Sequence, residues 1–115
     1  MKRYVELTET TRATHIVIEI KYNLGGFNCF TYAQEKRGYY LHVYPVTRET
    51  RDGYTTESFT AFTGTKRCIK EVTRKSAKAA AQAEQNAQNY IHDLVCYVCQ
   101  KNGFTIPGEF ITPEV

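Results

Sequence analysis

The hydrophobic period of the chain changes once, near Gly64, and this change constrains the fold more than any other feature. Before Gly64, apolar and polar residues alternate in short runs, as they do in strands with one buried face. After Gly64, apolar residues recur every three or four positions as far as Val98, which is typical of one face of an amphipathic helix. Because the chain has 115 residues, this order predicts a single α+β domain.

Four strands are predicted before Gly64. The clearest is His15 to Tyr22, in which Ile16, Ile18 and Ile20 fall on one face. The other three are expected at residues 27–32, 39–46 and 54–63, with turn residues at 23–26, 34–38 and 47–53. Such short connections favour a four-stranded antiparallel meander. Pro45 lacks an amide donor and indicates an edge or a strand end, and residues 1–13 are expected to form an arm or edge strand.

The second half of the chain predicts a long helix over residues 66–101, capped by Thr65 and ended by Gly103. An unbroken helix would be about 54 Å long, which exceeds a small domain. We therefore favour a break near Lys75, with Ser76 as a second N-cap. The bulky residues of 90–98 should pack on one sheet face, and the alanine-rich residues 77–87 should either approach the sheet closely or await a partner. Residues 104–115 are expected to be a loosely packed tail.

The net charge of +3 is concentrated in one segment. Six cations fall within thirteen residues, opposed only by Glu71: Lys66, Arg67, Lys70, Arg74, Lys75 and Lys78. On a helix, the members spaced by four would line one side and repel one another. Phosphate oxygens would relieve that repulsion and release counterions, so the segment is a candidate polyanion-binding surface. The alternative is an ordinary solvated helix face.

Aromatic residues on the third predicted strand form a second candidate surface. Tyr40, His42 and Tyr44 alternate with Leu41 and Val43 and so share one face, which Phe30 and Tyr32 join if the register allows. An open aromatic sheet face can stack nucleic-acid bases, and tyrosine is also enriched where proteins meet. The alternative is that these are ordinary strand tyrosines, since tyrosine favours strands.

The remaining reactive residues predict neither a metal site nor a catalytic site. Cys96 and Cys99 form a C-x-x-C inside the predicted helix, with Cys29 and Cys68 far away in the sequence, so all four are expected to be free thiols. The three histidines belong to no recognisable motif. We expect a non-enzymatic protein without cofactor or metal. The N-terminal residues lack the apolar stretch of a secretory signal, and no apolar run suits a membrane span, so a cytoplasmic protein without a membrane partner is expected.

Several short segments resemble small proteins encoded on phages and conjugative elements of Gram-positive gut bacteria, a group without an assigned activity. The resemblance covers most of residues 14–103 and rests on Leu24-Gly25-Gly26-Phe27-Asn28, Arg37-Gly38-Tyr39-Tyr40-Leu41, Pro45-Val46, residues 57–64 and residues 70–78. In size and in lacking catalytic motifs, the chain is also similar to anti-CRISPR and other anti-defence proteins, which share no common motif.

Three binding functions remain open from the sequence. The first is engagement of nucleic acid or a nucleoprotein complex through the basic segment. The second is inhibition of a protein target such as a CRISPR effector. The third is self-association as a homodimer through the alanine-rich stretch, with a structural or regulatory role.

Overall fold

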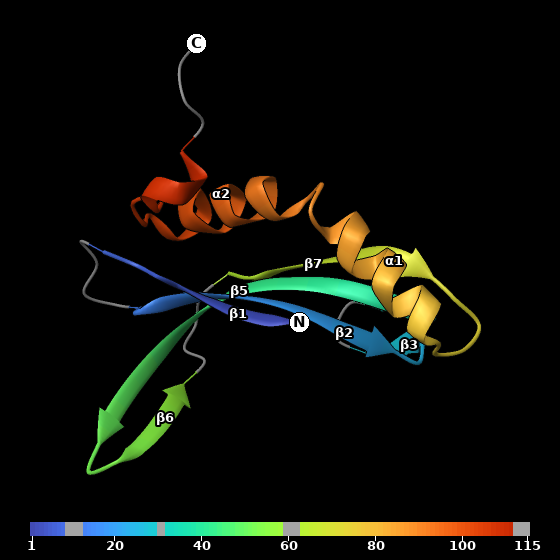
Figure 1. Ribbon diagram of the computed structural model, residues 1–115, viewed down its shortest axis with the longest axis horizontal. Helices are drawn as coiled ribbons and strands as arrows, with labels where there is room; N and C mark the ends of the chain where they lie inside the picture. The colour runs from blue at the N-terminus through green and yellow to red at the C-terminus, as the bar shows by residue number, and fades with distance from the viewer. Residues whose placement is uncertain (9–12, 30–31, 59–62, 112–115) are drawn as a thin grey trace.

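The computed structural model describes residues 1–8, 13–29, 32–58 and 63–111, and it shows a main antiparallel sheet covered on one face by two helices (Figure 1). The strands are β1 (Lys2–Glu6), β2 (His15–Asn23), β3 (Gly26–Asn28), β4 (Ala33–Glu35), β5 (Gly38–Arg51), β6 (Tyr54–Ser58) and β7 (Thr65–Glu71). The helices are α1 (Ala77–Ala87) and α2 (Ile91–Asn102), followed by the short 3₁₀ helix η1 (Gly108–Phe110). Neither α-helix in this part of the chain is both long and apolar enough to cross a bilayer.

Strand β5 organises the main sheet, which has five strands. One edge of β5 pairs with β2, which in turn pairs with β1, and every pairing is antiparallel. Residues 38–43 of β5 also pair with β7, while residues 47–51 pair with β6. Strands β3 and β4 form a separate two-stranded hairpin that extends the β2–β5 connection.

The chain is an α+β protein, but the predicted four-stranded meander followed by one long C-terminal helix is wrong. Residues 65–71 form strand β7, and the helical part is divided into two short helices. A shift of register explains why the period was misread. Tyr39 pairs with Lys70 and Tyr40 pairs with Cys68, so Ile69 is an extra, bulged residue. The bulge interrupts the period of two, and the remaining spacing of Ile69 and Val72 imitates one turn of helix.

Two of the predicted loops are also wrong. Residues 27–32 are not one strand, because β3 ends at Asn28 and β4 begins at Ala33, so the hairpin turn precedes the predicted loop at 34–38. Strand β5 continues through the predicted turn at 47–53 as far as Arg51, and Asp52 and Gly53 make the turn with positive φ values of 50° and 82°. The end of the predicted strand 54–63, residues 59–62, lies outside the described residues.

Pro45 lies inside a central strand, and not at an edge or an end as predicted. This position is nevertheless compatible with a residue that lacks an amide donor. Pairing with β7 stops at Val43 and pairing with β6 starts at Thr47, so Pro45 falls in the gap between these two ladders. A proline is tolerated where the sheet needs no donor on one side.

The core lies between the sheet and the helices. Ile16, Ile18, Leu41 and Val43 are fully buried on the sheet side. Helix α2 contributes Ile91, Val95, Val98 and Cys99, which confirms that the bulky half of the predicted helix packs on the sheet. Helix α1 contributes Ala79, Ala83 and Ala87, so the alanine stripe packs within the chain itself. Phe104 and Phe110, which follow α2, are buried in the same core.

The ends of both helices follow from local residues. The side-chain oxygen of Ser76 accepts a 3.0 Å hydrogen bond from the amide of Ala79, which confirms Ser76 as an N-cap. Gly103 ends α2 in the left-handed conformation, as predicted. The separation of the helices at residues 88–90 was not predicted, and no glycine or proline marks it.

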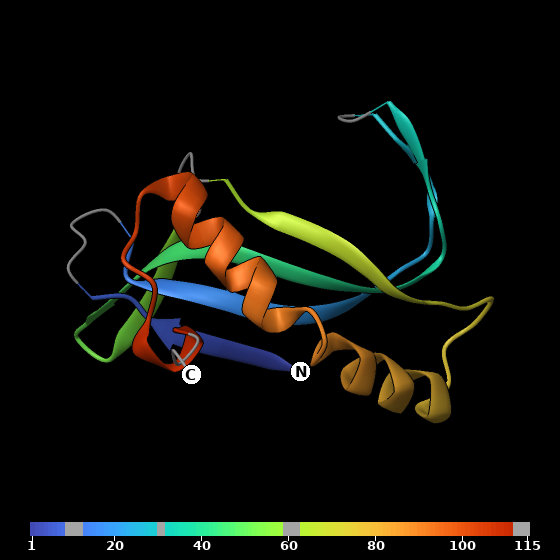
Figure 2. The same ribbon diagram turned by 90° about the horizontal axis from the view of Figure 1, so that it is seen from above.

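Two hairpins project from the body of the molecule. The β5–β6 hairpin descends from the sheet on the side opposite the helices (Figure 1). The β3–β4 hairpin curves away from the end of the sheet where β7 leads towards α1 (Figure 2, cyan). The helices cover one face of the main sheet, and the two hairpins extend from the ends of this sheet.

Candidate functional site

The six clustered cations lie on three different elements, so the predicted basic stripe along one helix is wrong. Lys66, Arg67 and Lys70 belong to strand β7. Arg74 and Lys75 lie in the link that follows, and Lys78 lies in the first turn of α1. Because a strand alternates its faces, neighbouring cations on β7 point to opposite sides of the sheet.

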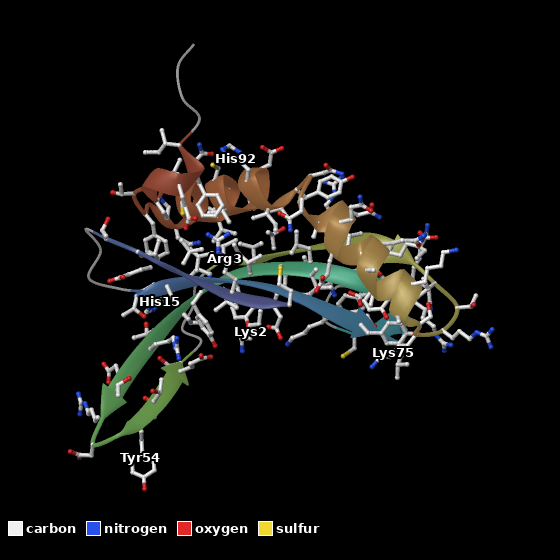
Figure 3. All side chains as sticks on the ribbon, viewed as in Figure 1. Lys2, Arg3, His15, Tyr54, Lys75 and His92 are labelled. Atoms are coloured by element: carbon white, nitrogen blue, oxygen red, sulfur yellow. The ribbon has the colours of Figure 1, made fainter. Side chains whose placement is uncertain are left out.

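Three of these cations are each held against an aromatic ring. Lys66 lies 5.4 Å from the centre of the Tyr40 ring and 2.5 Å from a carboxylate oxygen of Glu35. The Arg67 guanidinium lies 4.1 Å from the Tyr90 ring centre, and the Lys75 ammonium lies 5.1 Å from that of Tyr22, beside the start of α1 (Figure 3). These contacts give Lys66, Arg67 and Lys75 partners within the chain.

The other three cations meet at one cleft. Lys70, Arg74 and Lys78 line a hollow of about 840 Å³ between the end of β7 and the start of α1. Lys36 and Arg37, which connect β4 to β5, line the same hollow. We call this hollow, with these five cations, the basic cleft. Sequence reasoning missed Lys36 and Arg37 because nothing in the sequence places residues 36–37 beside residues 70–78.

The five cations of the basic cleft differ in the groups that they already contact within the chain. Lys36 lies 2.9 Å from Glu71, whose hydrogen bond and charge raise the pKa of the Lys36 ammonium. Arg37 donates 3.0 Å hydrogen bonds to the carbonyl oxygens of Leu24 and Thr73, so its guanidinium joins the hairpin base to the link before α1. Among the described residues, no carboxylate lies within ion-pair distance of Lys70, Arg74 or Lys78.

The start of helix α1 adds to the positive potential of the cleft. Ser76, Lys78 and Ala79 line it, and these residues form the cap and first turn of the helix. The N-terminal end of a helix carries a partial positive charge. The first turn of α1 contains no acidic side chain to offset that charge. The cleft is therefore suited to hold anionic groups.

The predicted aromatic face exists, but its rings are engaged. Tyr40, His42 and Tyr44 share the sheet face opposite the helices, as their alternation predicted. Tyr40 is only 7% exposed and donates a 2.7 Å hydrogen bond to the carbonyl of Lys36. The Tyr44 hydroxyl donates to Glu19 at 2.9 Å.

A smaller pocket of about 410 Å³ lies on this aromatic face, between Lys21, His42, Tyr44 and Lys66. Burial lowers the pKa of His42, and the charges of Lys21 and Lys66 lower it further. Glu19 lies 3.9 Å from Lys21, and Glu35 lies beside Lys66. Because each lysine has a carboxylate next to it, this pocket has a balanced charge and suits anions less well than the basic cleft.

Among the described residues, the most exposed aromatic rings lie in the hairpins. Phe27 is 64% exposed in β3, Tyr32 is 83% exposed in the β3–β4 turn, and Tyr54 is 78% exposed at the end of the β5–β6 hairpin (Figure 3). Tyr32 therefore does not join the face of Tyr40, and Phe30 lies outside the described residues. The sequence signal was present as aromatic residues near turns, but the end of β3 at Asn28 was not recognised.

The four cysteines are free, and only Cys96 and Cys99 lie on the same element. Cys29 is exposed in the β3–β4 hairpin, Cys68 is half-buried on β7, and Cys99 of α2 is fully buried in the core. Burial raises the pKa of the Cys99 thiol to about 11, and it also raises that of Cys96. Within the described ranges, His, Cys, Asp and Glu residues form no group of three that could hold a metal ion.

Comparison of the chain with protein-family models, with curated proteins and with solved structures gave no match.

Proposed function

We propose that this protein binds nucleic acid, without catalysis, by holding backbone phosphates in the basic cleft. One observation carries this proposal: Lys70, Arg74 and Lys78 line one hollow, and none of them has a carboxylate partner among residues 1–8, 13–29, 32–58 and 63–111. Like charges brought together in this way repel one another, and a bound polyanion removes that repulsion. It also releases the counterions that surround free nucleic acid, which favours binding at low salt.

The arrangement of neighbouring cations supports a polyanion over a single small anion. Lys36 and Arg37 border the cleft on one side, and Lys70, Arg74 and Lys78 line the rest, so five cations surround one hollow. A polymer with regularly spaced charges can contact several of these groups together. The start of α1 supplies backbone dipoles that favour phosphate at the same place.

Part of the basic character has another explanation. Among the described strands, β7 pairs only with β5, so its second edge is unpaired. Charged side chains, lysine above all, protect such edges from pairing with other chains. This explanation covers Lys66, Arg67 and Lys70, but it does not cover Arg74 and Lys78, which lie beyond the strand. Arg74 and Lys78 therefore support a binding role for the cleft more specifically than the cations of β7 do.

A salt series with two matched double variants tests the proposal. Binding of labelled oligonucleotides, both single strands and duplexes, is measured by anisotropy between about 50 and 300 mM salt. The test variant carries Arg74→Glu and Lys78→Glu. The control variant carries Arg51→Glu and Lys101→Glu, which change two exposed cations away from the cleft and give the same net charge.

We expect the native chain and the control to bind with similar affinity. The test variant should bind at least tenfold more weakly, and the slope of log Kd against log salt should fall by about two. Equal binding by both variants would show that only net charge matters and would remove the cleft from the account. If the native chain binds no oligonucleotide at the lowest salt, the proposal fails, and the cleft is better explained as a contact for an acidic protein surface.

A further inference from the structure

The β3–β4 hairpin, apart from Glu35 at its base, is an uncharged arm that exposes aromatic rings. From Leu24 to Gln34 the sequence contains no charged residue. Leu24, Phe27 and Tyr32 are 70%, 64% and 83% exposed, and the rings of Phe27 and Tyr32 lie 6.5 Å apart in an edge-to-face arrangement. Exposed aromatic side chains grouped in this way need an explanation, because folding alone does not bury them.

The arm is fixed to the body of the protein at its base. The Glu35 carboxylate accepts hydrogen bonds from Asn23 at 2.7 Å, from Asn28 at 2.9 Å and from Lys66 of β7 at 2.5 Å. Gly25 has a φ of 80° and lies close to Arg37. A Cβ atom at Gly25 would be only 2.9 Å from the amide nitrogen of Arg37. These contacts set the direction in which Phe27 and Tyr32 project.

The base of the arm is also part of the basic cleft. Lys36 and Arg37 follow β4 directly and line the cleft, and the Arg37 guanidinium contacts the carbonyls of Leu24 in the arm and Thr73 in the link. From Tyr32 to Lys36 the chain spans about 13 Å, at roughly 3.3 Å per residue. A short stretch of nucleic-acid backbone that leaves the cleft can therefore reach the exposed rings.

We propose that the preferred ligand is single-stranded nucleic acid, with its phosphates in the basic cleft and its bases stacked on Phe27 and Tyr32. This inference rests on the proposed function and names its ligand class. Proteins that bind single strands combine a cationic groove with aromatic stacking platforms. The bases of a duplex are already stacked on one another, so the same rings give a duplex no comparable gain.

The observations favour a nucleic acid over a protein groove or a second copy of the chain as the occupant of the arm. The arm itself is neutral, but it originates beside the basic cleft, whose lining has five cations and one acidic residue, Glu71, already paired with Lys36. A ligand that is both anionic and aromatic matches the cleft and the arm together. An apolar protein groove would match only the arm.

Single tyrosine variants at the two hairpin tips provide the test. Tyr32→Ala removes a ring of the arm, and Tyr54→Ala removes an equally exposed ring from the other hairpin. Tyr32→Phe keeps the ring and removes the hydroxyl. Each variant is titrated with a labelled single strand and with the matching duplex, in the salt series described above, and the mass of the native chain is measured by light scattering.

We expect Tyr32→Ala to weaken single-strand binding roughly 5- to 150-fold, the range for loss of one stacking platform. Its salt slope and its duplex affinity should stay unchanged, because the charges of the cleft are intact. Tyr32→Phe and Tyr54→Ala should bind like the native chain. Phe27→Ala should repeat the effect of Tyr32→Ala.

The outcomes separate this inference from the proposed function. If Arg74→Glu with Lys78→Glu abolishes binding but Tyr32→Ala changes nothing, the arm has no stacking role and the cleft function stands. If the native chain binds neither single strands nor duplexes, both proposals fail together. A native dimer that becomes monomeric in Tyr32→Ala would show that the arm contacts a second copy, and it would overturn the inference.

Discussion

The cations of residues 66–78 are chemically alike, and their surroundings decide what each one can do. Lys66, Arg67 and Lys75 lie over aromatic rings, so part of their charge is used within the chain. Lys70, Arg74 and Lys78 border the basic cleft without a carboxylate partner among the described residues. The sequence showed that positive charge was concentrated here, but it could not show that the six cations divide into these two groups.

Gly38 is the residue at which a small change should have a large effect. A Cβ at this position would lie 2.2 Å from the carbonyl oxygen of Lys70 and 3.0 Å from the Cα of Glu71. We expect Gly38→Ala to lower the free energy of unfolding by about 1–3 kcal/mol, because β7 must move away from β5. Urea denaturation measures the loss.

Gly108→Ala is the control for this prediction, since no atom lies within 4 Å of a Cβ built at Gly108 and its φ is ordinary. It should leave the free energy of unfolding within about 0.5 kcal/mol of the native value. Equal stability of the two variants would contradict the close packing of β5 against β7.

At the scale of elements, β7 shows why part of the fold could not be predicted. Only Ile69 of this strand is buried, and the bulge at Ile69 breaks the alternation that identifies strands. The charged residues around it suit an unpaired edge as well as they suit a solvated helix. Its assignment depends on pairing with β5, which is a contact between distant residues and leaves no local signal.

The helices were easier to recognise, because their apolar spacing is local. Ser76 and Gly103 were identified correctly as terminal residues, since a cap and a left-handed C-terminal glycine are properties of single positions. The separation of α1 from α2 at residues 88–90 has no such residue. There the sheet determines where each helix packs, and packing overrides the continuous helical propensity of the sequence.

The β3–β4 hairpin should respond to acid through one residue. Three hydrogen-bond donors, Lys66 first among them, lower the pKa of Glu35 from 4.5 to about 2. A group whose pKa is lower in the folded state stabilises that state above its unfolded pKa, and the contribution disappears as the pH falls to the folded pKa. Glu35 therefore stabilises the fold fully above about pH 4.5 and loses this effect towards pH 2.

The variant Glu35→Gln tests this pH dependence. We expect it to be less stable than the native chain at pH 7, and the difference should shrink as the pH is lowered from about 4.5 towards 2. Urea denaturation midpoints of both proteins across this range measure the difference in stability. The other carboxylates are the same in the two proteins, so their effects largely cancel in this difference. A difference that stays constant with pH would mean that Glu35 is not held as an anion by Lys66, Asn23 and Asn28.

At the scale of the whole molecule, the site depends on contacts that no single segment encodes. The basic cleft combines residues 36–37, the end of β7 and the start of α1. The sequence identified Lys70, Arg74 and Lys78 because they are close together in the chain. It gave no indication of Lys36 and Arg37, and it favoured Tyr40 and Tyr44 over the exposed Phe27 and Tyr32. Burial of side chains is a property of the complete fold, so it could not be judged from residue type alone.

The most direct test of the account is to locate the ligand on the molecule. Backbone amide shifts of the isotope-labelled native chain are recorded by NMR while a short single-stranded oligonucleotide is added at low salt. The account predicts that the largest changes occur at Lys36, Arg37 and residues 70–79, around the basic cleft. Changes confined to Lys21, His42 and Lys66 on the opposite sheet face, or no changes at saturating oligonucleotide, would contradict it.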